Sequence, residues 1–490
     1  MLGITRAAFV RLCFTSCFLL SVCARTFALA PQGGESINGF PNWSERVLHE
    51  WTNRARCDPQ VEMNQCGSAC SEGACYSAKA PLPWVLELNR SARFHSDEMV
   101  AQNFFAHDSH CTLPANISSL YPSSCTGAAS CACQGGISTC APVCTTWNSR
   151  IALFGGNASG EVIASVSSSD PVTAFYLWLY EPYTPTTCGF GTGNGHRWLL
   201  LSASGGLGAG VSGQKSTIDF GAASPSVPKI PSGSHYPRQA SSVAVWANWY
   251  DSAAPTEALV NVDGTTHPLT LQRGTPQNGA WSASISGVGS GCHRYYFIFQ
   301  DSSGATFTYP GTGSLGIGPA GCADWDASRP LTAYSLCFGD GTAGSCPCLN
   351  SGAAGHGCAN SQVAAGALLG ASGGTLPDTV VLSSSGELTT ALSIFLQGNA
   401  RIASVTFGDG LRCAGGNLKR IGLKNAVAGT ASYPEAGDPS ITLRSAALGD
   451  SIAPGSSRYY QAYYRDASLV FCPAPPGNTW NATQALQIVW

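Results

Sequence analysis

The feature that most constrains the fold of this 490-residue chain is its cysteine content, 22 residues. So many thiols are typical of an oxidising, exported environment, where they pair as disulfides, and are unusual in the cytosol. Three lie near the N-terminus, and the other nineteen form three groups: eleven from Cys57 to Cys188, two at Cys292 and Cys322, and six from Cys337 to Cys472. We therefore expect three separately cross-linked units, with the odd cysteine in the first group.

The N-terminus has the pattern of a secretory signal peptide. Two arginines accompany a mostly apolar run, residues 12–24, which has the length of a signal-peptide core and is too short to span a bilayer. Small residues suitable for cleavage end at Ala24 or at Ala30, and we take residues 1–30 as the signal. The sequence thus predicts a secreted, extracellular protein without a transmembrane segment.

Charge narrows the range of partners. Charged residues make up 11% of the chain, and the formal net charge is −3. Phosphate backbones are bound by basic surfaces, so we expect no nucleic acid partner. The 57 glycines and only 3 methionines favour turn-rich β structure, and 44% hydrophobic residues are enough for packed cores.

Composition shifts divide the chain into units. A Pro/Ser/Gly-rich stretch follows the first cysteine group, and alternating apolar residues such as Val243, Val245, Ala247 and Trp249 then predict strands. We expect a domain with helical patterns over 31–222, a linker over 223–238, an immunoglobulin-like β-sandwich over 239–320, a second linker over 321–336, and a Cys-containing β-sandwich module over 337–490. A Cys292–Cys322 disulfide would cross-link the middle unit.

The first unit combines helical patterns with short motifs that contain His and Glu. Val47, Leu48 and Trp51 share one face of a helix predicted over residues 42–55, and Asp170-Pro171 is typical of a helix start. The motifs, in chain order, are Pro81-Leu82-Pro83-Trp84, Ala92-x-x-His95-Ser96-x-x-Met99, Phe105-Ala106-His107-x-Ser109, Gly160-Glu161, Trp178-x-x-Glu181, Gly195-His196 and a closing Gly208-x-Gly210-Val211.

In order and spacing, these motifs resemble the CAP superfamily, whose SCP domains occur in cysteine-rich secretory proteins, antigen 5 and plant pathogenesis-related proteins. The resemblance covers about residues 42–220. It implies a three-layer α-β-α sandwich with one open cleft that two histidines and two glutamates line. Carried over by motif, these residues are His107, Glu161, Glu181 and His196.

Two departures from the family pattern concern this cleft. The family often has Gly-Glu-Asn, whereas this chain has Gly160-Glu161-Val162. Residues 110–147 also form a long Cys-rich insertion next to the first histidine, His107, and could reshape or cover the cleft.

The four residues allow two interpretations. His107 and His196 can hold Zn²⁺ or another divalent cation and leave positions open for water, which Glu161 or Glu181 could deprotonate as a general base. Alternatively, the histidines and glutamates pair by hydrogen bonds and only hold the walls of the cleft. His110, in the insertion, is an outside candidate for a third ligand.

The expected function is therefore that of a secreted CAP-domain protein whose cleft binds a divalent metal and a ligand such as a lipid, a peptide or a glycan. Two alternatives stay open. One is a metal-dependent hydrolase that uses Glu161 or Glu181. The other is an adhesin whose β modules bind cell-surface or matrix polysaccharide, for which Trp246 and Tyr250 are candidate exposed aromatics.

Overall fold

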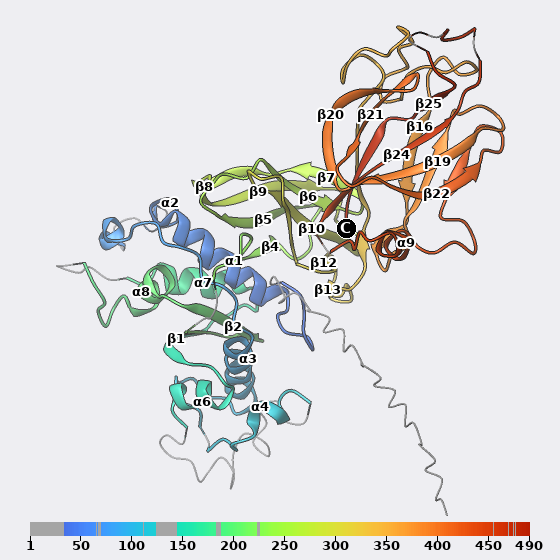
Figure 1. The fold of residues 1–490 in the computed structure, drawn as a ribbon. Coiled ribbons are helices and arrows are strands. Elements are labelled where there is room, and N and C mark those ends of the chain that lie inside the picture. The colour runs from blue at the N-terminus through green and yellow to red at the C-terminus, as the bar shows by residue number, and fades with distance from the viewer. Residues whose placement is uncertain are drawn as a thin grey trace, which may run out of the picture.

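The computed structural model describes residues 34–490 except 65, 67–69, 111, 124–144, 183–187, 223–225, 454, 469, 474 and 476. The predicted signal peptide and most of the Cys-rich insertion lie outside the described residues. The chain forms a helix-containing unit followed by two β-rich units, which Figure 1 shows in blue to green, green to yellow and orange to red. None of the described helices has the length and apolar character that crossing a membrane requires.

The first unit contains most of the helices: α1 (Trp43–Cys57), α2 (Pro59–Met63), the 3-10 helix η2 (Ser71–Cys75), α3 (Leu86–Ala101), α4 (Ile117–Leu120), α6 (Trp147–Leu153), α7 (Pro171–Leu179) and α8 (Gly195–Ser202). Two predicted helix starts are confirmed. Asn42 and Glu45 form a reciprocal capping box at the start of α1. Asp170 accepts from the Val172 N–H at 3.0 Å at the start of α7. These bonds satisfy donors that a helix start otherwise leaves unpaired.

A three-stranded antiparallel sheet lies at the centre of the first unit, in the order β1 (Ala158–Ser165), β3 (Lys215–Gly221), β2 (Gly206–Ser212). Because side chains alternate along a strand, the sheet has two faces, and helices cover both. On one face Val162, Leu207 and Ile218 share a core with α1, α7 and α8. On the other face β2 lies against the backbone of α3, an approach that Gly208 and Gly210 permit.

The second unit is a β-sandwich. One sheet has the order β4 (Gly233–Tyr236), β5 (Ser242–Tyr250), β9 (Asn278–Ser286), β8 (Thr270–Thr275); the other has the order β13 (Trp325–Asp326), β12 (Ser314–Ile317), β10 (His293–Gln300), β6 (Glu257–Val262), β7 (Thr265–Pro268), with β11 (Thr306–Tyr309) paired to β10. Val243, Val245 and Trp249 lie in the core between the sheets, as their alternation predicts. The predicted Cys292–Cys322 disulfide is present.

The third unit is built from several sheets. Its largest has the order β15 (Thr332–Leu336), β26 (Ala485–Val489), β24 (Ser457–Arg465), β19 (Leu392–Gly398), β22 (Lys419–Asn425), with β25 (Trp480–Ala482) on β24. A second sheet has the order β16 (Leu368–Ser372), β18 (Val381–Ser385), β23 (Ala431–Tyr433). Two further sheets are strand pairs: β20 (Ala400–Phe407) with β21 (Gly410–Gly415), and β14 (Arg329–Pro330) with β17 (Gly374–Leu376). Helix α9 spans Ile441–Ala447. The disulfides of this unit are Cys337–Cys413, Cys346–Cys358 and Cys348–Cys472.

Both stretches that composition predicts as linkers contain paired strands. Strand β4 lies within 223–238 and pairs with β5, and β13, β14 and β15 lie within 321–336 and pair with strands of the second or third unit. These stretches therefore contribute to sheets in addition to connecting units. Glycine and serine raise local flexibility, and proline lacks an N–H donor, but these residues do not prevent edge pairing where partners are available.

Helix α1 joins the first two units. Every residue of α1 except Ser44 is buried. The Trp43 ring N–H donates to the His235 carbonyl at 2.9 Å, and the Arg54 guanidinium lies 4.9 Å from the ring centre of Trp246. Trp246 is thus half-buried against the first unit and not fully exposed, and Tyr250 is also half-buried.

Disulfides in the first unit include Cys66–Cys70 and Cys75–Cys188. Among the described cysteines Cys57 is free, and it belongs to the group in which we predicted the odd thiol. It is buried at the end of α1, where its S–H donates to the Arg54 carbonyl at 3.1 Å. Burial, with the nearby Asp58 and Glu50 carboxylates, raises the pKa of the Cys57 thiol far above its ordinary value.

Replacing Gly208 by Ala should destabilise the first unit. The added Cβ would lie 1.9 Å from the Asn89 nitrogen in α3, so the helix must move away from the sheet. We expect a loss of about 1–3 kcal/mol or more, seen as a lower midpoint of thermal unfolding. Gly321→Ala is the matched control, because its Cβ would meet nothing within 4 Å. Equal midpoints for the two variants would contradict the close approach of α3 to β2.

Cys57 should resist alkylation in the folded protein. The thiolate is the reactive form, and burial disfavours it. Iodoacetamide added without reductant should leave Cys57 unmodified under native conditions. It should modify Cys57 in a denaturing concentration of guanidinium chloride. Mass spectrometry of the peptide that contains Cys57 would show the difference. Rapid native labelling would mean that the end of α1 is open to solvent.

Candidate functional site

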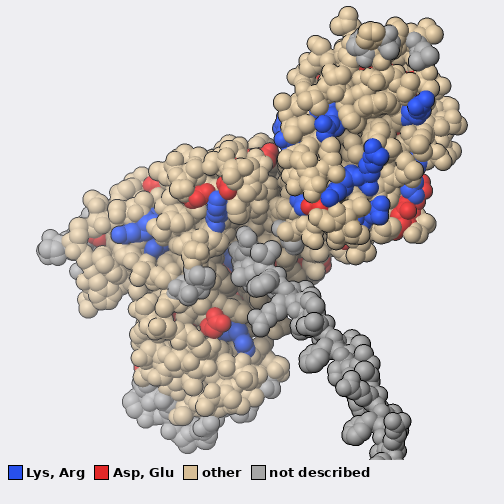
Figure 2. Space-filling view, in the orientation of Figure 1, with Lys and Arg blue, Asp and Glu red and all other residues tan. Residues whose placement is uncertain are grey.

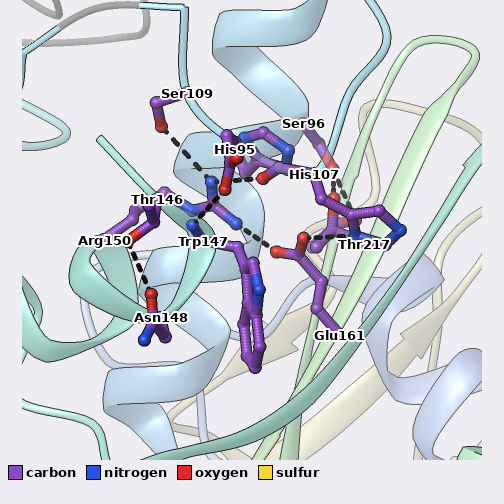
Figure 3. A network of polar contacts seen from close by, with 12 residues as sticks. His95, Ser96, His107, Ser109, Thr146, Trp147, Asn148, Arg150, Glu161 and Thr217 are labelled. Atoms are coloured by element: carbon purple, nitrogen blue, oxygen red, sulfur yellow. Dashed lines mark hydrogen bonds and ion pairs between the residues drawn. The ribbon is translucent and has the colours of Figure 1, made fainter. Parts of the chain in front are cut away.

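The first predicted histidine and glutamate form a pair. His107 lies in the loop after α3, and Glu161 lies on β1, with 2.8 Å between the Nδ1 atom of His107 and Oε1 of Glu161. The side chain of His107 is 48% exposed, whereas that of Glu161 is 1% exposed. The imidazole therefore reaches the surface, and the carboxylate holds it from below (Figure 3).

Arg150 on α6 supports this pair. Its Nη2 contacts Oε2 of Glu161, and its Nη1 donates to the His107 carbonyl at 3.0 Å (Figure 3). Burial alone would raise the pKa of Glu161, but Arg150, then His95 and the His107 hydrogen bond, lower it to about 2. Glu161 is therefore ionised at neutral pH, and both of its oxygens are engaged.

A second layer of buried groups lies behind Arg150. Oε1 of Glu98 accepts from Ser109 Oγ at 2.6 Å and lies 2.6 Å from Nδ1 of His95, whose Nε2 contacts the Ala106 carbonyl at 2.9 Å. All three side chains are buried. These contacts hold the loop that carries His107.

Asp219 adds a buried carboxyl next to Glu161. It lies on β3 directly opposite Glu161 in the sheet register. Burial, and then the Glu161 charge, raise the pKa of Asp219 well above its ordinary value. Ionising two carboxylates this close together costs free energy because their charges repel. Glu161, which Arg150 neutralises, is therefore the anion, and Asp219 carries the proton.

The second predicted pair is His196 with Glu181. Oε2 of Glu181 lies 2.9 Å from Nδ1 of His196, and its Oε1 accepts from the Arg197 N–H at 2.8 Å. Glu181 thus binds the first turn of α8, where a negative charge is favoured. The His196 side chain is 38% exposed and that of Glu181 is 14% exposed.

The two pairs lie on either side of the edge strand β1. A Cβ on Gly160 would meet Leu199 of α8 at 2.6 Å, so Gly160 faces α8 and the neighbouring Glu161 faces Arg150 and His107. The Gly160-Glu161 motif therefore has two roles: the glycine lets α8 approach the strand, and the glutamate anchors the histidine on the other face.

No three ligand atoms of this tetrad lie within 4.8 Å of one another among the described residues. The set of ligand atoms that does meet this distance is Cys348, Asp409 and Cys472, but its two cysteines form a disulfide. The four predicted residues thus form two His–Glu pairs and not a four-ligand cage. His110 stacks on Phe104, with ring centres 4.3 Å apart.

The pairing selects which ring nitrogen is available. A carboxylate can only accept a hydrogen bond, so each Nδ1 carries the hydrogen and Nε2 keeps its lone pair in the neutral ring. The described residues offer Nε2 of His107 and Nε2 of His196 no hydrogen-bond partner. Sequence reasoning missed Arg150, Glu98 and Asp219, although Glu98 follows His95 at helical spacing.

No protein-family model matches this sequence, and no curated protein matches it either. Dimeric latent PorU from Porphyromonas gingivalis is 12% identical, covers 55% of this chain and 22% of its own, and has a TM-score of 0.16. A cycloalternan-degrading enzyme from Trueperella pyogenes in complex with isomaltose is 11% identical over 54% and 30% of the two chains, with a TM-score of 0.14. The chain thus spans less than a third of these two structures, and such low scores support no statement about fold or function.

Glu161→Gln and Asp219→Asn should affect stability in opposite ways. Glu161→Gln removes the carboxylate in direct contact with Arg150 and leaves Glu98, 4.0 Å away, as the counter-charge of this buried guanidinium; breaking the buried pair costs about 3–5 kcal/mol at pH 7. Because the pKa of Glu161 is lowered on folding, its contribution is complete above its ordinary value of 4.5 and is lost as pH falls towards 2. The pKa of Asp219 is raised on folding. Asp219 therefore lowers the free energy of unfolding increasingly as pH rises above the ordinary carboxyl pKa of 3.8. Asp219→Asn should therefore be neutral or stabilising at pH 7.

Unfolding by denaturant at pH 3, 5 and 7 would check both substitutions. The destabilisation by Glu161→Gln should shrink at pH 3 compared with pH 7. If Asp219→Asn lowered the free energy of unfolding by several kcal/mol at pH 7, Asp219 would be ionised and paired, and not protonated.

Proposed function

We propose that this chain is an exported protein of the CAP type, in which His107 and His196 hold a divalent cation, Zn²⁺ or a similar ion, through their Nε2 atoms. The observation that carries the proposal is the matched pairing of both histidines. Each is tied at Nδ1 to a glutamate and each ring is more than one third exposed. The six disulfides among the described residues support an oxidising, exported location.

The donor chemistry fits such an ion. Histidines that bind metals almost always donate their other ring N–H to a carboxylate or carbonyl, which orients the ring and raises its basicity. Glu161 and Glu181 stand in this supporting position. Two protein ligands would leave coordination positions of the ion open. When bound, the ion would act as a Lewis acid towards an oxygen atom of a ligand at such a position.

The hydrolase alternative gains no support from the two glutamates. Glu161 is 1% exposed and contacts both His107 and Arg150, and Glu181 contacts both His196 and the backbone of α8. A general base needs an oxygen within reach of the water that it deprotonates. We therefore propose a binding function, with a peptide, lipid or glycan as the ligand that would complete the site.

Zinc titration of the full chain tests this function. Calorimetry with ZnCl₂ should show one site, and the double variant His107→Ala/His196→Ala should lose it. Glu181→Gln should weaken binding about 10–100-fold, because an amide has a single, neutral acceptor oxygen and cannot serve both His196 and the Arg197 N–H as the carboxylate does. His356→Ala, in the third unit, is the matched control and should bind as the unmodified protein does.

Equal zinc binding by the double variant and the unmodified protein would overturn the assignment of the ligands. No binding by either would leave the hydrogen-bonded pairs as a purely structural device.

A further inference from the structure

A polar groove lies between the second and third units, far along the chain from the His/Glu pairs. Its cavity volume is 660 Å³. One wall comes from β6 and from the loop between β10 and β11, including Glu257 and Ser303–Thr306. The other wall comes from β20, β24 and β26, including Arg401, Tyr459 and Gln487. This volume is in the range of sites for small ligands, which often lie where units meet.

The units that form the groove are held together by direct contacts. Asn261 of β6 donates to Thr332 Oγ1 of β15 at 2.6 Å, and Tyr296 of β10 shares the same hydroxyl. Thr306 and Ser457 lie 3.2 Å apart between their hydroxyl oxygens. Figure 1 shows the second unit against the base of the third. The walls of the groove are therefore fastened to each other, as a preorganised site requires.

Three polar side chains in the groove have no hydrogen-bond or ion-pair partner among the described residues. The Glu257 carboxylate, the Arg401 guanidinium and the Tyr459 hydroxyl make no hydrogen bond or ion pair with any described side chain or backbone group. Tyr459 is 8% exposed, and this burial raises the pKa of its hydroxyl, with smaller effects in opposite directions from the Arg401 and Glu257 charges. Charged groups are scarce on this protein, as Figure 2 shows, so an unpaired Glu and an unpaired Arg in one groove stand out.

The sheet register places two residues of the groove wall, Gln487 and Tyr459, in one row with Tyr334. Tyr334 of β15 pairs with Gln487 of β26, and Gln487 pairs with Tyr459 of β24. These three residues form a row across the sheet on one face. The Tyr334 hydroxyl is buried and has no hydrogen-bond partner. Burial, and then the charge of Glu257, raise the pKa of Tyr334.

We propose that this groove binds a short, neutral oligosaccharide. Sugar hydroxyls can donate to Glu257 and accept from Arg401 and from the Tyr459 hydroxyl. One unpaired negative and one unpaired positive side chain leave no net charge to favour an anionic or a cationic ligand, whereas a neutral sugar can hydrogen-bond to both. The proposal does not depend on metal binding at His107 and His196.

A glycan array probed with the full chain tests the proposal. The array carries neutral gluco-, manno- and galacto-oligosaccharides beside their sialylated, sulfated and amino counterparts. We expect retention of at least one neutral class, and a loss of about tenfold or more in affinity for Glu257→Gln and for Arg401→Gln. Ala305→Trp, at an exposed position on the lip of the groove, should block binding without disturbing a core.

Arg420→Gln is the matched control. Arg420 is exposed, as Arg401 is, but lines a separate cavity of 480 Å³ in the third unit. It should leave binding unchanged, and thermal unfolding of each variant should match the unmodified protein. Retention of charged glycans alone, no retention of any neutral glycan, or an equal loss for Arg401→Gln and Arg420→Gln would each overturn the proposal.

Discussion

The near-complete burial of α1 is the constraint on which the first two units depend. A buried charge costs several kcal/mol unless it is paired, and this helix contains three arginines and two glutamates. Arg54 pairs with Glu62, Glu45 with Arg93, and Arg56 donates to three backbone carbonyls. Glu50 lacks such a pair, and burial raises its pKa to about 8. The pairing fastens α1 between the three-stranded sheet and the second unit, and this sheet carries Glu161.

Local patterns predicted the elements well where one physical signal decided them. The spacing of Val47, Leu48 and Trp51 predicted α1, and strand alternation predicted β5, because burial of one face imposes these periods. Periodicity also assumes an opposite polar face in water, so it could not show that the second unit covers that face of α1. Composition likewise predicted the linkers, but it carries no information on the distant partners with which β4 and β15 pair.

The sequence motifs named the four residues of the candidate site but did not show which of them contact each other. The motifs named His107, Glu161, Glu181 and His196, and the alternative of hydrogen-bonded His–Glu pairs matches the contacts. Arg150 belongs to no motif, and only the fold brings it to Glu161. Its charge decides that Glu161, and not Asp219, is the anion, so the electrostatics of the site could not be derived from the motifs alone.

The central claim is that one ion joins the two histidines across the edge of β1. Zinc-soaked crystals, measured on both sides of the zinc absorption edge, test it most directly. We expect a single anomalous peak about 2.0–2.1 Å from Nε2 of both His107 and His196. A peak bound to only one of them, or Nε2 atoms too far apart to share an ion in the zinc-soaked crystals, would contradict it.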